Sequence, residues 1–172
     1  IGSILSCSAI GGMAITFLMS KIIDKVGMPR VISFFVSQLA AYCTSELDWL
    51  KLLPLDRNHL LHGACHFPFE PKSDSRVKPH GYRIRASVNI EMCPPFSYIH
   101  WGRIPSGKSK QGWLSGEQTF RFDDLEECAV HTLAHECFHF LSGSRQVKEK
   151  NTEANANWWA DKWLSQFRDQ VE

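Results

Sequence analysis

The sequence predicts an α+β fold: helices at the N-terminus, then a small, mostly antiparallel or mixed sheet, then two packed helices at the C-terminus. Three observations predict this order. Apolar residues recur at helical spacing up to about residue 50. Segments in which apolar and polar residues alternate follow, separated by turns rich in Pro, Gly and Ser. The last third carries helix-capping signals at two places, which indicates two successive helices.

A chain of 172 residues suits one compact domain. Within it we distinguish a helical N-terminal segment, residues 1–50, from residues 51–172, which contain the predicted sheet and the last two helices. Residues 1–12 are an extension if Met13 is the natural start. Residues 1–20 carry no charge, which leaves export or membrane anchoring open. Because Ser and Gly interrupt them and no basic residue precedes them, we expect a cytoplasmic protein without a membrane partner.

Two helices are predicted in the N-terminal segment. The first covers residues 13–26, where apolar residues crowd together and Gly27 stands just beyond the end. The second covers residues 29–50. Pro29 suits the first position of a helix because its φ is fixed near the helical value, and the apolar residues after it keep helical spacing. We interpret both helices as scaffold.

The middle of the chain is predicted to form strands. The clearest covers residues 82–90, where apolar and polar residues alternate from Tyr82 to Val88 as in a half-buried strand. The other candidates are residues 59–69, 98–104 and 113–122. No internal repeat relates them, so they predict one small sheet rather than a repeated unit.

The two C-terminal helices have the strongest local signals. Asp123 and Glu126 are predicted to form a capping box, in which the Asp accepts from early backbone N–H groups and the Glu reaches back. This helix should run to about residue 141 and end near Gly143. After a short polar loop, Thr152 is predicted to cap a last helix that runs to about residue 170. A loop this short makes the two helices neighbours in space.

The composition argues against some functions. A formal net charge of +1 argues against a nucleic-acid partner, since such proteins normally carry a basic excess or a basic face. The six cysteines include no Cys-x-x-Cys pair, so a cysteine-rich zinc site is not expected and free thiols are the simpler interpretation. The oligomeric state is left open.

The first C-terminal helix contains the sequence His135-Glu136-Cys137-Phe138-His139, an HExxH motif. Residues four apart lie on one face of a helix, so His135 and His139 can present two imidazoles to one zinc ion. Glu136 lies beside that face, where it can take a proton from a water that zinc has acidified. The pattern therefore predicts one zinc ion and a general base.

Two histidines leave a catalytic zinc ion one protein ligand short. The extended pattern HExxHxxGxxH fails, because Ser142 and Arg145 stand where it needs Gly and His, and no His follows residue 139. A carboxylate from the next helix is the remaining source. Glu153, in the first turn of that helix, is the best placed. Three other carboxylates stay open as alternatives: Asp161, Asp169 and Glu149.

Two segments carry a family resemblance: Thr132-Leu133-Ala134-His135-Glu136-x-x-His139-x-Leu141 and Glu153-x-x-Ala156-Asn157-x-Trp159-Ala160-x-x-Trp163-Leu164. They resemble the ImmA/IrrE group and related minimal gluzincins, small zinc peptidases with HExxH on one helix and a Glu ligand on the next. The resemblance covers roughly residues 123–170. It implies a zincin-like catalytic region within residues 51–172, and it implies that Asn157 holds a ligating histidine by a hydrogen bond.

These features together predict a zinc metallopeptidase that acts on a peptide or protein, with Glu136 as general base. His131, one turn before His135, can support the site, although an ordinary polar role is the simpler interpretation. The strand predicted at residues 113–122 is a candidate edge for pairing with a substrate strand. Four side chains are open as the oxyanion partner: His131, Tyr98, His100 and Arg145.

A second class of function stays open beside the peptidase. Only 33 residues follow His139, which leaves no large C-terminal lobe to build a deep substrate cleft. The alternative is therefore a zinc-bearing regulatory or partner-binding protein with restricted or no proteolytic activity.

Overall fold

The computed structural model describes residues 18–55, 59–71, 78–110 and 112–170. In chain order its elements are β1 (Ile22–Asp24), α2 (Pro29–Leu39), β2 (Leu47–Pro54), β3 (Leu61–His66), β4 (Tyr82–Val88), β5 (Phe96–Pro105), β6 (Trp113–Phe122), α3 (Leu125–Gly143) and α4 (Glu153–Asp169). The predicted α+β class is confirmed, but the strands divide into two sheets instead of one.

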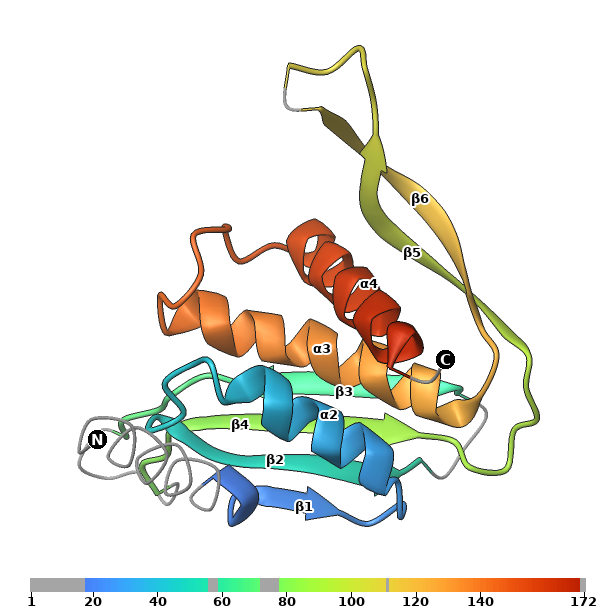
Figure 1. The fold of residues 1–172 in the computed structure, drawn as a ribbon. Helices are drawn as coiled ribbons and strands as arrows, with labels where there is room; N and C mark the ends of the chain where they lie inside the picture. Colours follow the sequence, from blue (N-terminus) through green and yellow to red (C-terminus); the bar gives the residue numbers. More distant parts are fainter. Residues whose placement is uncertain (1–17, 56–58, 72–77, 111, 171–172) are drawn as a thin grey trace, which may run out of the picture.

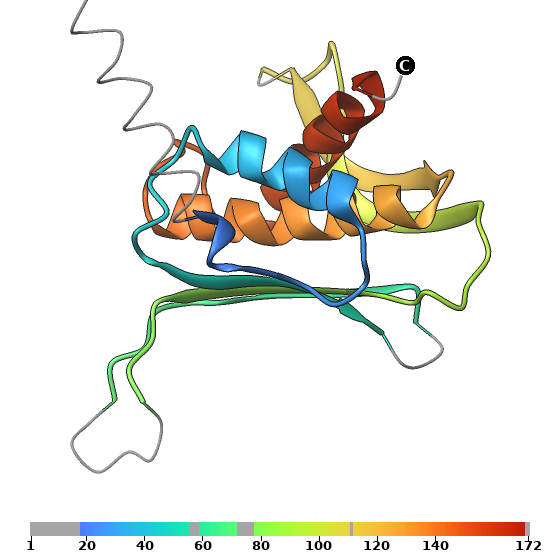
Figure 2. The same ribbon diagram turned by 60° about the horizontal axis from the view of Figure 1, so that its bottom comes forward.

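The elements are arranged in layers. A four-stranded sheet has the order β1-β2-β4-β3, and α2 and α3 cover one of its faces (Figure 1 and Figure 2). α4 packs on α3, further from the sheet, and the hairpin of β5 and β6 lies beside α4 and extends past it (Figure 1). The described core fills the space between the sheet, α2, α3 and α4.

The first predicted helix, residues 13–26, is wrong in the part that can be compared. Residues 1–17 lie outside the described residues, and Ile22–Asp24 forms strand β1 instead of helix. The carboxylate of Asp24 ends this strand, because it accepts hydrogen bonds from three successive backbone N–H groups and so fixes a turn before α2.

The second predicted helix, residues 29–50, is right only in its first half. α2 begins at Pro29 as predicted but ends at Leu39, and strand β2 follows. Leu47 and Leu50 are both buried although they are three residues apart, because the register between β2 and β4 is irregular between them. This irregularity gives a strand the apolar spacing of a helix.

The four-stranded sheet is mixed. β1 pairs with β2 and β2 with β4 in parallel, while β3 pairs antiparallel to β4 at the outer edge. In β4, Tyr82, Ile84 and Ala86 are buried towards the helices, whereas Arg83 and Arg85 alternate with them. The alternation predicted for this strand is confirmed. β3 is shorter than the strand predicted for residues 59–69, and it passes directly beside α3.

β5 and β6 form a separate antiparallel hairpin, paired from Phe96 with Phe122 to Pro105 with Trp113. They correspond to the strands predicted at residues 98–104 and 113–122. β5 packs against α4, so the base of the hairpin closes one side of the helix pair.

The capping box of α3 lies one residue later than predicted. Asp124, and not Asp123, is the N-cap and accepts from the backbone N–H of Glu127 at 2.8 Å. The Glu127 carboxylate in turn accepts from the backbone N–H of Asp123 at 2.7 Å. Thr152 caps α4 as predicted, accepting from the backbone N–H of Asn155 at 3.3 Å.

Two further observations concern the cysteines and the helices of the described residues. The five cysteines among the described residues are free, in line with the expectation of free thiols. Within the part of the chain that the structure describes, no helix has the length and apolarity needed to cross a bilayer.

Candidate metal centre

Three side chains from α3 and α4 converge on one point. The Nε2 atoms of His135 and His139 lie 3.2 Å apart. The carboxylate of Glu153 lies 3.1 Å from Nε2 of His135 and 3.5 Å from Nε2 of His139. In a tetrahedral zinc site with bonds of about 2.0–2.1 Å, neighbouring ligand atoms are about 3.3 Å apart. The three side chains are therefore spaced as ligands of one such ion.

Local structure explains this convergence. His135 and His139 are one helical turn apart on α3, so their rings project from the same face. Thr152 starts α4 at a point that places Glu153, its first residue, opposite that face. Of the carboxylates left open by the sequence, Glu153 is thus the one that joins the two histidines, while Asp161 contacts His131 instead.

The far side of each histidine ring is held by an asparagine. Nδ1 of His135 lies 2.7 Å from Oδ1 of Asn157, whose amide donates to the backbone carbonyl of Trp101 at 2.6 Å. Because that amide is used as a donor, Oδ1 faces His135 and Nδ1 of the ring must donate. Nδ1 of His139 lies 2.5 Å from Oδ1 of Asn151.

These hydrogen bonds select the tautomer of each ring in its neutral form. When Nδ1 donates, Nε2 of a neutral imidazole carries a lone pair. Two lone pairs and a carboxylate then face one another with no donor among them, an arrangement that a cation would satisfy. Burial, together with the neighbouring His139, lowers the pKa of His135 to about 4, which keeps that ring in its neutral form.

Glu136 lies beside the triad and against the sheet edge. Its side chain is buried, and it accepts a hydrogen bond from the backbone of Cys65 on β3. Burial, reinforced by the negative charge of Glu153, raises the pKa of Glu136 to about 7. A carboxyl group with a pKa near neutrality can both take and release a proton at physiological pH.

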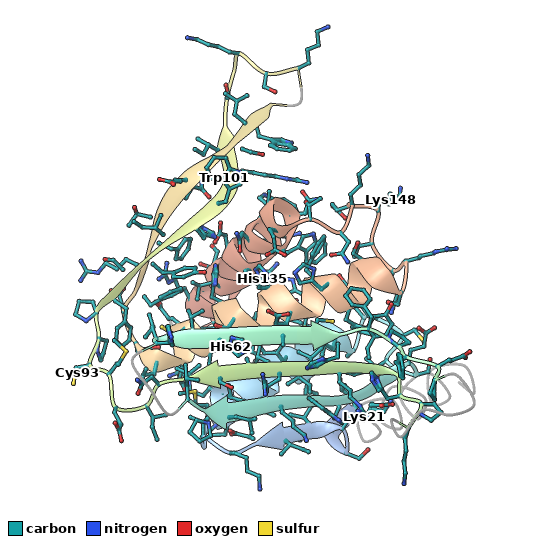
Figure 3. All side chains as sticks on the ribbon, turned by 180° about the vertical axis from the view of Figure 1, so that it is seen from behind. Lys21, His62, Cys93, Trp101, His135 and Lys148 are labelled. Atoms are coloured by element: carbon teal, nitrogen blue, oxygen red, sulfur yellow. The ribbon has the colours of Figure 1, made fainter. Side chains whose placement is uncertain are left out.

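A cleft of about 150 Å³ opens between α3, β3, β5 and α4 at this point. Figure 3 shows the place from the side of β3, with His135 between that strand and the hairpin residue Trp101. The cleft is lined by Leu61, Gly63, Tyr98, His131, Thr132, His135, Glu136, Glu153 and Asn157. A larger hollow of about 360 Å³ lies between α2 and the end of α4, but its lining includes no His, Cys, Asp or Glu.

His131 also belongs to a second cluster. Its Nε2 atom lies 3.1 Å from Oδ1 of Asp161, and Nε2 of His100 lies 3.7 Å from the same oxygen. Among the described residues, two groups of His and carboxylate side chains could therefore hold a metal ion: His135 with His139 and Glu153, and His100 with His131 and Asp161.

Sequence reasoning missed several residues of this region. The sequence pattern does not indicate Asn151, Gly63 or the backbone of Cys65, and it indicates Asp161 only as an alternative ligand of the first triad. Asn151 could have been noticed as a polar residue just before the N-cap, but the strand contacts have no local sequence signal. Compared with known protein families, curated proteins and solved structures, the chain matches none.

Proposed function

We propose that this protein is a zinc-dependent metallopeptidase of the minimal gluzincin type, with His135, His139 and Glu153 as zinc ligands and Glu136 as general base. One observation carries the proposal: three ligand atoms with zinc-like spacing lie beside a buried carboxylate, and His135, Glu136 and Glu153 line one cleft. A zinc ion bound there would acidify a water and polarise a peptide carbonyl.

The surroundings of Glu136 support a role in proton transfer. It is held from β3 through the backbone of Cys65, and its carboxylate is screened from bulk water. It would take the proton from the attacking water and later pass it to the leaving amine. Tyr98 lines the same cleft and is our candidate for stabilising the oxyanion; Arg145 is exposed and does not line the cleft.

The edge of the four-stranded sheet is an argument that the substrate is a peptide. β3 is the outer strand, and Leu61 and Gly63 on it line the cleft beside Glu136. An extended peptide could add to this edge through main-chain hydrogen bonds, which would bring its carbonyl groups towards Glu136. We therefore propose β3 as the docking strand in place of residues 113–122, which lie in the separate hairpin.

The small volume of the cleft favours a restricted substrate. About 150 Å³ accommodates little more than the groups around one peptide bond, so we expect cleavage of few sequences. The second candidate function follows from the same observation: a zinc-bearing protein that binds one partner and cleaves it slowly or not at all.

A peptide-library digest tests the proposal. The purified chain, loaded with zinc, is incubated with the library, and new termini are counted by mass spectrometry. We expect cleavage that a chelator abolishes and that Glu136→Gln reduces by about 10²–10⁴-fold. Glu117→Gln, an exposed change on β6, is the matched control and should leave cleavage unchanged. Zinc bound at one equivalent in the triad with no cleavage of any peptide would favour the partner-binding alternative.

A further inference from the structure

We propose that His100, His131 and Asp161 bind a second divalent cation, separate from the His135–His139–Glu153 site. His131 Nε2 and His100 Nε2 lie 3.1 Å and 3.7 Å from the same carboxylate oxygen of Asp161. The ligand atoms of the three residues all lie within 4.8 Å of one another. They come from β5, α3 and α4, so three elements meet at this point.

The burial of His100 supports a role as a metal ligand. Only 5% of the residue is exposed, and neither ring nitrogen has a hydrogen-bond partner among the described residues. Its neighbours in the hairpin are the rings of Tyr98 and Phe120, with centroids 6.0 Å and 5.9 Å away. A buried imidazole without a partner is costly, because it has lost its hydrogen bonds to water. A cation bound to Nε2 would remove the part of that cost that falls on this nitrogen.

The donor set suits a transition-metal ion. Imidazole nitrogen and carboxylate oxygen are common zinc ligands, and two imidazoles with one carboxylate are the same donor set as in the first triad. Burial lowers the pKa of His131, which favours the neutral, metal-binding form of its ring. The hydrogen bond between His131 and Asp161 satisfies one ring alone, whereas a cation would be shared by His100, His131 and Asp161 together.

The proposed role of this ion is structural. It would tie the hairpin strand β5 to α3 and α4 at one point. The same strand supplies the Trp101 carbonyl that orients Asn157, which in turn orients His135. A bound cation would therefore hold the support of the first site in place, and it needs no contact with a substrate.

Zinc content per folded chain tests the proposal. The purified protein is equilibrated with zinc, passed through gel filtration and analysed for metal. We expect about two zinc ions in the unchanged chain. His100→Gln and Asp161→Asn should each lower the content to about one, while the controls His62→Gln on β3 and Asp169→Asn on α4, both exposed, should not.

A first-site variant separates this inference from the proposed function. The double variant His139→Ala with Glu153→Ala should still bind about one zinc ion, and zinc should raise its melting temperature. Adding Asp161→Asn should remove both effects. Circular dichroism confirms that each variant is folded; if His100→Gln fails this check, Asp161→Asn, at a side chain that is 23% exposed, decides.

Two outcomes would overturn the second site. One is a single zinc ion in the unchanged chain that neither His100→Gln nor Asp161→Asn affects. The other is a folded first-site double variant that binds no zinc. Either result would mean that Asp161 only bridges two histidines, and either can occur whether or not the first site is a peptidase.

Discussion

Gly63 on β3 leaves the space that the carboxylate side chain of Glu136 occupies. A Cβ atom at Gly63 would lie 2.9 Å from both Cγ and Cδ of Glu136, and closer still to Oε1. Real Cβ atoms essentially never make such approaches. The absence of a side chain at one position of the sheet edge is thus what allows the proposed base to reach its place.

Gly63→Ala should displace Glu136 and leave the metal ligands in place. We expect hydrolysis to fall by at least 10-fold, because a general base displaced from the reacting water loses most of its effect. Zinc content should stay the same, because no ligand is touched. Gly107→Ala, where an added Cβ meets nothing within 4 Å, is the control for kinetics and zinc analysis. Unchanged activity in Gly63→Ala would argue against Glu136 as the base.

Glu153→Gln should weaken zinc binding more than a change at Asp169, the one carboxylate of α4 that lies outside the two clusters. The substitution removes the negative charge that faces both Nε2 atoms but keeps the size of the side chain. We expect at least a 10-fold rise in the zinc dissociation constant, measured by competition with a chromophoric chelator. Asp169→Asn, at the exposed end of the same helix, is the matched control. Equal affinities for the two variants would remove Glu153 from the ligand set.

Asn157 should affect zinc affinity without touching the metal. Asn157→Ala removes the acceptor for Nδ1 of His135, so the ring can rotate and change tautomer. We expect affinity to fall by about 10–100-fold. Asn157→Asp keeps the acceptor but loses the donor to the Trp101 carbonyl, and it should recover part of the affinity. If both variants bind as tightly as the unchanged chain, the hydrogen bond has no role in metal binding.

The ion pair between Glu127 and Arg168 should make the fold sensitive to acid. Two hydrogen bonds of 2.6 Å and 2.7 Å join them. Burial alone would raise the pKa of Glu127, but the hydrogen bonds and charge of Arg168, with the backbone N–H of Asp123, outweigh it and lower that pKa below 4.5. Because the folded value is the lower one, the stabilisation is present above the unfolded value and is lost as pH falls through the folded value.

Urea unfolding of Glu127→Gln measures this effect. Arg168 is 38% exposed, so solvent screening limits the expected loss to about 1–2 kcal/mol at neutral pH. The difference from the unchanged chain should shrink as the pH falls below 4.5. Glu126→Gln, in an ion pair whose Arg30 is 54% exposed, should cost less than about 1 kcal/mol at any pH. A difference that grows towards acid would have the wrong sign.

The sequence predicted the C-terminal helices well because their signals are local. The N-cap at Thr152 and the turn spacing from His135 to His139 depend only on near neighbours. The prediction of helix for residues 40–50 is wrong for the opposite reason. β2 is a buried parallel strand with an irregular register, so its apolar residues do not alternate and resemble a helix.

The residues of the candidate site also differ in whether a local sequence signal indicates them. His135, Glu136 and His139 came directly from the motif, and Glu153 came from the need for a further ligand. His100 could not be linked with Asp161, because they meet only through the packing of the hairpin on α4. Gly63 carries no signal at all without the pairing of β3 beside α3.

The proposed ligands lie close together along the chain, whereas the proposed base depends on a residue that is far from it in sequence. Glu153 follows His135 by 18 residues, within one helix-loop-helix segment, whereas Glu136 follows Gly63 by 73 residues. Contacts between near neighbours form early in folding, and contacts across long loops form late. We therefore expect the proposed ligand set to form before the proposed catalytic arrangement is complete. Substitutions in the sheet could then remove the proposed catalytic activity while the proposed metal site in the helix-loop-helix segment remains.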